Sequence, residues 1–70
     1  MGYKSVRGSD VDRDGMYLEV STPDGQLVLE IFYSDQTGKM SITLYQEAVS
    51  LDAIEAFIPY AKWALTPTKR

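Results

Sequence analysis

The sequence predicts an α+β fold, a three-stranded antiparallel β-meander with one C-terminal α-helix packed on one face of the sheet. Two similar turn sequences separate three runs of alternating apolar residues, and the last third of the chain has helical periodicity. A chain of 70 residues has room for one small domain. We therefore assign residues 16–66 to a single β-β-β-α domain, preceded by residues 1–15 and followed by a tail at 67–70.

Hairpin turns are predicted at residues 22–25 and 35–38, where Pro or Asp and a closing Gly favour a reversal of the chain. The strands then cover residues 16–22, 26–34 and 39–46. Because side chains alternate along a strand, the residues divide between two faces. One face is purely aliphatic and needs a cover: Met16, Leu18, Val20, Leu27, Leu29, Ile31, Met40, Ile42 and Leu44.

The cover is a helix predicted in the C-terminal segment. Ser50 is a good N-cap, and Thr66 ends the helix because the residue before Pro67 avoids helical dihedral angles. At about 100° per residue, the large apolar side chains form one stripe along this helix. The stripe contains Leu51, Ile54, Phe57, Ile58, Ala61, Ala64 and Leu65.

Residues 1–15 leave two arrangements open. Residues 12–15 are similar to the other two turns, so a fourth, N-terminal edge strand around residues 5–11 could precede them. Gly8 and Asp10 weaken such a strand and favour a mobile arm.

The composition excludes several kinds of catalytic site. The chain has no cysteine and no histidine, which excludes disulfides, thiolate zinc sites, thiol nucleophiles and imidazole bases. Glu19 and Glu30 share a sheet face, but a shallow face on so small a chain offers no pocket for paired-carboxylate catalysis. We expect a protein that is not an enzyme and needs no cofactor, with one weak candidate for Ca²⁺.

That candidate consists of Asp10, Asp12 and Asp14, which alternate and are followed by Gly15. The pattern resembles the start of an EF-hand loop, since hard cations prefer several oxygen ligands on a tightly turned backbone. Ser21 stands where the loop needs its bidentate Glu, and no helix precedes the segment. The alternative interpretation is an Asp-rich turn that enters a strand.

The second sheet face carries four large apolar side chains, which we call the aromatic sheet face: Tyr17, Val28, Phe32 and Tyr45. One helix covers only one side of a sheet, so we expect a second copy of the chain, as a C2 homodimer, or a protein partner to cover this face. The alternatives are that residues 1–15 fold across it or that it is simply exposed to solvent. Tyr60 and Trp63 on the helix flank are a further candidate interface, or else the rim of the core.

The charge of the chain bears on its partners and location. The net charge is −3, and residues 16–66 carry two Lys against seven Asp or Glu. Such an acidic body repels phosphate backbones and anionic lipid. Because no signal peptide or membrane-spanning run is visible, we expect a cytoplasmic protein. An acidic inhibitor of the immunity-protein type, bound to a basic partner, remains open as an alternative function.

A second alternative is a single-stranded nucleic-acid-binding module. The order of strands and helix is broadly similar to that of the small sheet-plus-helix subunits of single-strand-binding transcription coactivators. This resemblance implies a sheet whose aromatic side chains stack on bases. Lys39 is the only cation of the predicted sheet, so such binding would need Lys4, Arg7, Lys69 and Arg70 to gather beside the aromatic sheet face.

Overall fold

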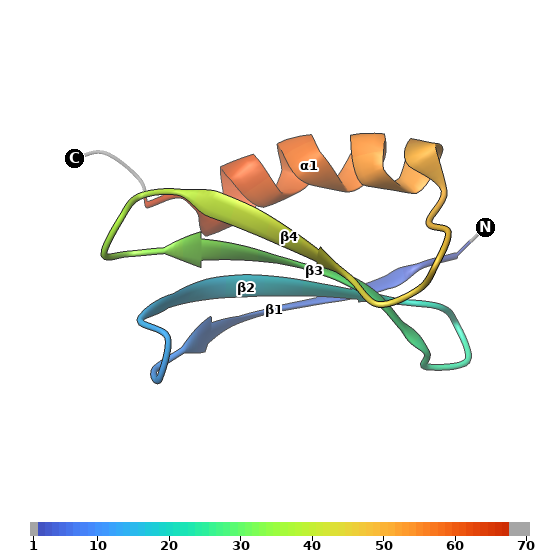
Figure 1. Cartoon of the computed structure of the whole chain (residues 1–70), viewed down its shortest axis with the longest axis horizontal. Coiled ribbons are helices and arrows are strands. Elements are labelled where there is room, and N and C mark those ends of the chain that lie inside the picture. Colours follow the sequence, from blue (N-terminus) through green and yellow to red (C-terminus); the bar gives the residue numbers. More distant parts are fainter. Residues whose placement is uncertain (1, 68–70) are drawn as a thin grey trace.

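The computed structural model describes residues 2–67 and contains a four-stranded antiparallel sheet crossed on one face by a single helix (Figure 1). In chain order the elements are β1 (Lys4–Asp10), β2 (Gly15–Ser21), β3 (Leu27–Ser34), β4 (Met40–Leu44) and α1 (Leu51–Leu65). The spatial order of the strands is β1-β2-β3-β4, so each strand pairs with its neighbour in the sequence. The predicted α+β meander with a C-terminal covering helix is confirmed. Apart from Pro67, the predicted tail lies outside the described residues.

Of the two arrangements left open for residues 1–15, the structure contains the edge strand and not the mobile arm. This strand, β1, covers Lys4–Asp10 and forms one edge of the sheet. It pairs antiparallel with β2 along its whole length. Gly8 is tolerated because the Tyr17 ring of the opposite strand lies across it, so that a Cβ at this position would meet Tyr17 Oη at 2.6 Å. An aromatic ring over a strand glycine supplies packing that the glycine itself lacks.

The hydrophobic core lies between α1 and the two central strands. Its buried members on the sheet and the helix are Leu18, Val20, Val28, Leu29, Ile31, Ala61 and Leu65. A register shift at the end of β2, between Val20 and Ser21, brings these two residues opposite Leu29 and Leu27 and leaves Val28 between them. Val28 therefore belongs to the core cluster, although its place in the strand alternation predicted the aromatic sheet face.

Helix α1 has the predicted ends but a different rotation. The Ser50 hydroxyl accepts a hydrogen bond from the Ala53 N–H at 3.4 Å, and Thr66 is the C-cap. Leu51 is 67% exposed, whereas Ala53 is buried. The helix packs on β2 and β3, so its buried stripe is turned away from Leu51 and Ile58 toward Ala53. Within residues 2–67, no helix has the length and apolar character needed to cross a membrane.

Candidate functional site

The outer face of the sheet, opposite α1, is partly covered by an arginine of the chain itself. Arg13 belongs to the turn between β1 and β2, and its Cζ lies 4.2 Å from the centre of the Phe32 ring. The guanidinium donates two hydrogen bonds to the Glu30 carboxylate, at 3.1 and 2.7 Å, and Nε donates to Asp10 at 2.6 Å. The middle of this face is therefore an ion-pair network above an aromatic ring.

Charge explains why Arg13 takes this position. Glu30 is only 7% exposed, and Glu19 lies directly opposite it on β2. Two carboxylates facing each other across a sheet repel, and a buried carboxylate needs a cation or hydrogen-bond donors. The side-chain hydrogen bonds to Glu30 and then to Asp10 raise the pKa of Arg13, and the hydrogen bond from Arg13 lowers the pKa of Asp10. Both shifts favour the charged forms of Arg13 and Asp10.

The predicted interface residues of the aromatic sheet face do not form one open patch. Tyr17 and Phe32 are partly buried, and Phe32 lies across Gly15, where a Cβ would meet Phe32 Cζ at 2.6 Å. Val28 is buried in the core, so it is not accessible to a partner. Tyr45 is the exposed member of the set. Sequence reasoning missed Arg13; the available signal was a carboxylate in the central strand with a cation in a neighbouring turn.

The three aspartates of the candidate Ca²⁺ site do not come together. Both carboxylate oxygens of Asp10 accept hydrogen bonds from Arg13. The backbone N–H of Arg13 donates to one at 3.1 Å, and its side-chain Nε donates to the other. Asp12 and Asp14 are exposed, and Asp14 has a left-handed φ of 58°. In the part of the chain that the structure describes, no three acidic side chains are placed to hold a metal ion. The segment is a turn that Arg13 fastens to the sheet.

Two exposed apolar side chains of the sheet lie instead on the helix side of β4. Since α1 sits over β2 and β3, the outer strand has little helix above it, and Ile42 and Leu44 are 42% and 49% exposed. A hollow runs between this strand and the helix, and we call it the β4–α1 groove. Its lining residues are Ile31, Met40, Ser41, Ile42, Ile58 and Lys62.

The open edge of β4 offers free backbone groups. The Tyr45 N–H donates to the Val28 carbonyl at 2.9 Å, and the Lys39 carbonyl accepts from the Ser34 N–H at 3.0 Å. Because hydrogen bonding alternates along an antiparallel ladder, the odd-numbered residues of this strand bond to β3. The residues whose N–H and carbonyl groups point to the open edge are therefore Met40, Ile42 and Leu44.

The two edges of the sheet differ in chemistry. β4 reads Met-Ser-Ile-Thr-Leu and has no charge, proline or glycine. The opposite edge, β1, carries Lys4, Arg7 and Asp10 and contains Gly8. Charges and irregular residues are the usual means by which an edge strand avoids pairing with another chain, so β1 is protected and β4 is not.

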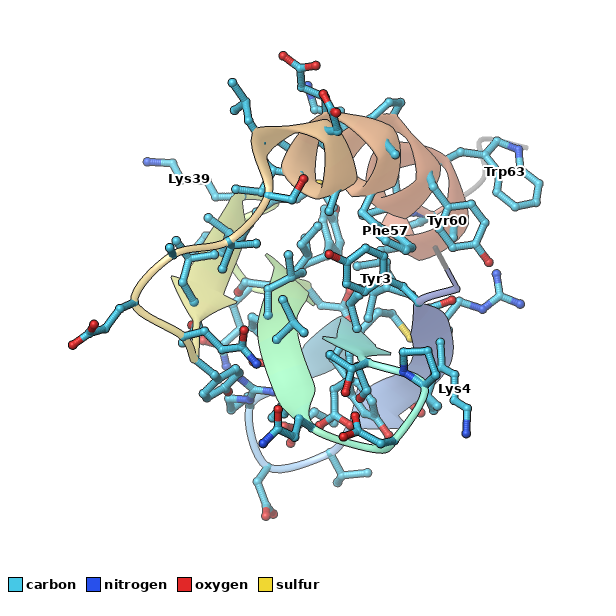
Figure 2. All side chains as sticks on the ribbon, turned by 90° about the vertical axis from the view of Figure 1, so that its right-hand side faces the viewer. Tyr3, Lys4, Lys39, Phe57, Tyr60 and Trp63 are labelled. Atoms are coloured by element: carbon cyan, nitrogen blue, oxygen red, sulfur yellow. The ribbon has the colours of Figure 1, made fainter. Side chains whose placement is uncertain are left out.

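The second predicted interface, on the helix flank, is exposed but small. The Tyr60 and Trp63 rings lie 6.0 Å apart, and Trp63 is 74% exposed. Figure 2 shows Trp63 pointing away from the molecule, whereas Tyr3 and Phe57 meet edge to face at 6.2 Å. Tyr3 and Phe57 therefore line the core at this end, and Trp63 does not close it.

Among the residues that the structure describes, Lys4 and Lys39 do not come together, and the cation that lies over the aromatic sheet face is Arg13. In Figure 2, Lys4 and Lys39 lie on opposite sides of the molecule. Lys69 and Arg70, which the nucleic-acid alternative also requires, lie outside the described residues. Comparison of the chain with protein-family models, with curated proteins and with solved structures gave no match. A function for this chain must therefore be inferred from its own surfaces.

Proposed function

We propose that this protein is a non-catalytic interaction module that associates with a second copy of itself through the open edge of β4 and the β4–α1 groove. The observation that carries the proposal is that β4 is an edge strand without charged residues and that two of its apolar side chains, Ile42 and Leu44, are exposed. Burying these side chains against another chain removes apolar surface from water, which favours association.

The distribution of charge favours a second copy as the occupant. Two acidic bodies repel each other, so they associate where this repulsion is smallest. The lining of the groove contains one lysine, Lys62, and no carboxylate. Lys39, the other lysine of residues 16–66, directly precedes β4. Repulsion between two acidic copies is therefore smaller at the groove than at surfaces that carry carboxylates. A basic partner would instead prefer a surface rich in carboxylates.

The proposed surface differs from the aromatic sheet face that the sequence suggested. On that face Arg13 already covers Phe32, and the buried Val28 contributes nothing to a contact. Docking there would also bring the Glu19 and Glu30 carboxylates of two copies close together, which is unfavourable. The helix side of β4 has neither obstacle.

The test is the mass of the chain in solution, measured by sedimentation equilibrium over a range of concentrations. The wild type is expected to form a dimer, and Leu44→Glu is expected to weaken association at least about tenfold by placing a carboxylate in the apolar contact. Val6→Glu is the matched control, because Val6 is an exposed apolar residue of the opposite edge strand and lies on the outer face. Circular dichroism verifies that both variants fold.

Three outcomes decide the question. A dimer that Leu44→Glu dissociates and Val6→Glu leaves intact supports the proposal. A dimer lost in Val6→Glu but kept in Leu44→Glu would move the interface to the outer face. A wild type that is monomeric at every concentration contradicts self-association altogether.

A further inference from the structure

We infer that the two copies join by strand pairing: β4 of one chain hydrogen-bonds antiparallel to β4 of the other, and the two sheets become one continuous sheet. The inference rests on the proposed self-association and adds the geometry of the contact. The alternative for the same surface is packing of side chains alone, with the two strand edges left in water.

The backbone supports this geometry because the free groups of β4 match those of a second copy. Met40, Ile42 and Leu44 present their N–H and carbonyl groups to the open edge. A two-fold axis at Ile42 places it opposite the partner's Ile42 and places Met40 opposite the partner's Leu44. Each such pair exchanges two hydrogen bonds, so the contact contains roughly six.

The alternation also restricts the register. Odd-numbered residues of β4 already bond to β3, so only even-numbered residues can form the hydrogen-bonded pairs of the new contact. A register shifted by two residues would leave one end of the strand unpaired. The axis at Ile42 is the arrangement that pairs all residues from Met40 to Leu44.

A two-fold axis at Ile42 also brings favourable pairs of side chains together on both faces of the sheet. On the helix side, Ile42 meets the partner's Ile42, and Met40 meets the partner's Leu44, which are favourable apolar pairs. Beyond the strand ends, Lys39 lies at the end where the partner's Glu47 follows its strand. Opposite charges therefore meet at each end of the contact, and on the outer face Lys39 lies beside the partner's Tyr45.

A single introduced cysteine tests the axis directly, because the chain has no cysteine of its own. Across a hydrogen-bonded antiparallel pair the Cα atoms are about 5.5 Å apart, within the range of roughly 4.4–6.8 Å that a disulfide spans. Ile42→Cys should therefore cross-link to its own copy under mild oxidation. Thr43→Cys is the matched control, since its Cα would lie about 8 Å from its own copy.

Amide hydrogen exchange gives a second, non-perturbing readout on the wild type. The N–H groups of Ile42 and Leu44 should exchange slowly at concentrations where the dimer forms and at least about tenfold faster in dilute solution. The Thr43 N–H, which bonds to β3, should stay protected at both concentrations. The open-edge amides are the ones that report pairing.

The outcomes separate this inference from the proposal on which it rests. Cross-linking of Ile42→Cys above Thr43→Cys, with concentration-dependent protection of Ile42 and Leu44, supports strand pairing. A dimeric mass with unprotected Ile42 and Leu44 amides and no preferential cross-link would overturn strand pairing and leave self-association standing. A monomer at all concentrations overturns both.

Discussion

The central carbon of the Arg13 guanidinium lies 4.2 Å from the centroid of the Phe32 ring, while the same group is hydrogen-bonded to Glu30. One side chain from the first turn thus covers an aromatic ring of β3 and neutralises a buried carboxylate beside it. This contact explains how a sheet face of mixed polarity exists without a second layer of structure.

Removing Arg13 should destabilise the fold more than removing a surface arginine. In Arg13→Ala, Glu30 would lose its cation and both hydrogen bonds while it still faces Glu19, so the melting temperature should fall clearly. Adding Glu30→Gln to this variant should recover part of the loss. Thermal denaturation of the single and double variants measures the coupling, with Arg7→Ala, on the exposed edge strand, as control. Equal melting temperatures for the two arginine variants would show that the network contributes nothing.

Acid should weaken the fold partly through Asp10. Its pKa in the folded protein is lowered from the ordinary 3.8 by the hydrogen bonds from Arg13, so the unfolded chain binds a proton there more readily. The stabilisation is fully present above about pH 5 and is lost as the pH falls through the lowered folded pKa. Asp10→Asn keeps an oxygen for the Arg13 N–H and removes the charge.

The stability difference between the wild type and Asp10→Asn should therefore be largest near neutral pH and shrink toward about pH 2. Urea denaturation at a series of pH values measures this difference. A difference that stays constant over the series would rule out the carboxylate as its origin.

Two strand glycines should differ sharply in their tolerance of a methyl group. A Cβ at Gly15 would overlap the Tyr33 carbonyl, which is backbone, and also meet the Phe32 ring. We expect Gly15→Ala to cost about 3 kcal/mol, near the upper end for overpacking. At Gly8 the obstacle is the far end of the Tyr17 side chain, which can rotate, so Gly8→Ala should cost about 1 kcal/mol. Urea denaturation measures the free energy of unfolding of both variants. A larger loss for Gly8→Ala than for Gly15→Ala would contradict this account.

The rotation of α1 can be tested with the same substitution at its two ends. Leu65 is buried in the core, so Leu65→Ala should cost about 2–5 kcal/mol. Leu51 is mostly exposed, so Leu51→Ala should change the stability by less than about 0.5 kcal/mol. Denaturant titrations give both values. A large loss of stability in Leu51→Ala would mean that Leu51 packs in the core, as the stripe predicted from the sequence places it.

The fold class could be predicted because its signals are local. The Pro23 and Gly25 turn, the alternation of apolar residues and the Ser50 cap each act within a few residues, and the elements begin and end close to where these signals place them. The N-terminal strand was harder to predict, since Gly8 weakens a strand on its own. Only the pairing with β2 reveals that Tyr17 compensates for it.

The surfaces could not be predicted equally well, because they depend on contacts between distant residues. Arg13 and Glu30 are 17 positions apart, and only the pairing of three strands brings them together. The predicted apolar stripe of α1 contains more residues than the helix buries against β2 and β3, so periodicity alone does not say that Leu51 and Ile58 are exposed. The open edge of β4 likewise follows from strand order and not from composition.

The contrast between the two edges of the sheet has a consequence for how far assembly can go. A ribbon of strands with two receptive edges can add copies without limit and become a fibre. Here, once two copies have joined through β4, each outward boundary of the enlarged sheet is a strand bearing Lys4, Arg7 and Asp10. Under the proposed pairing, these charged edges would disfavour the addition of a third copy, so growth would stop at a closed pair.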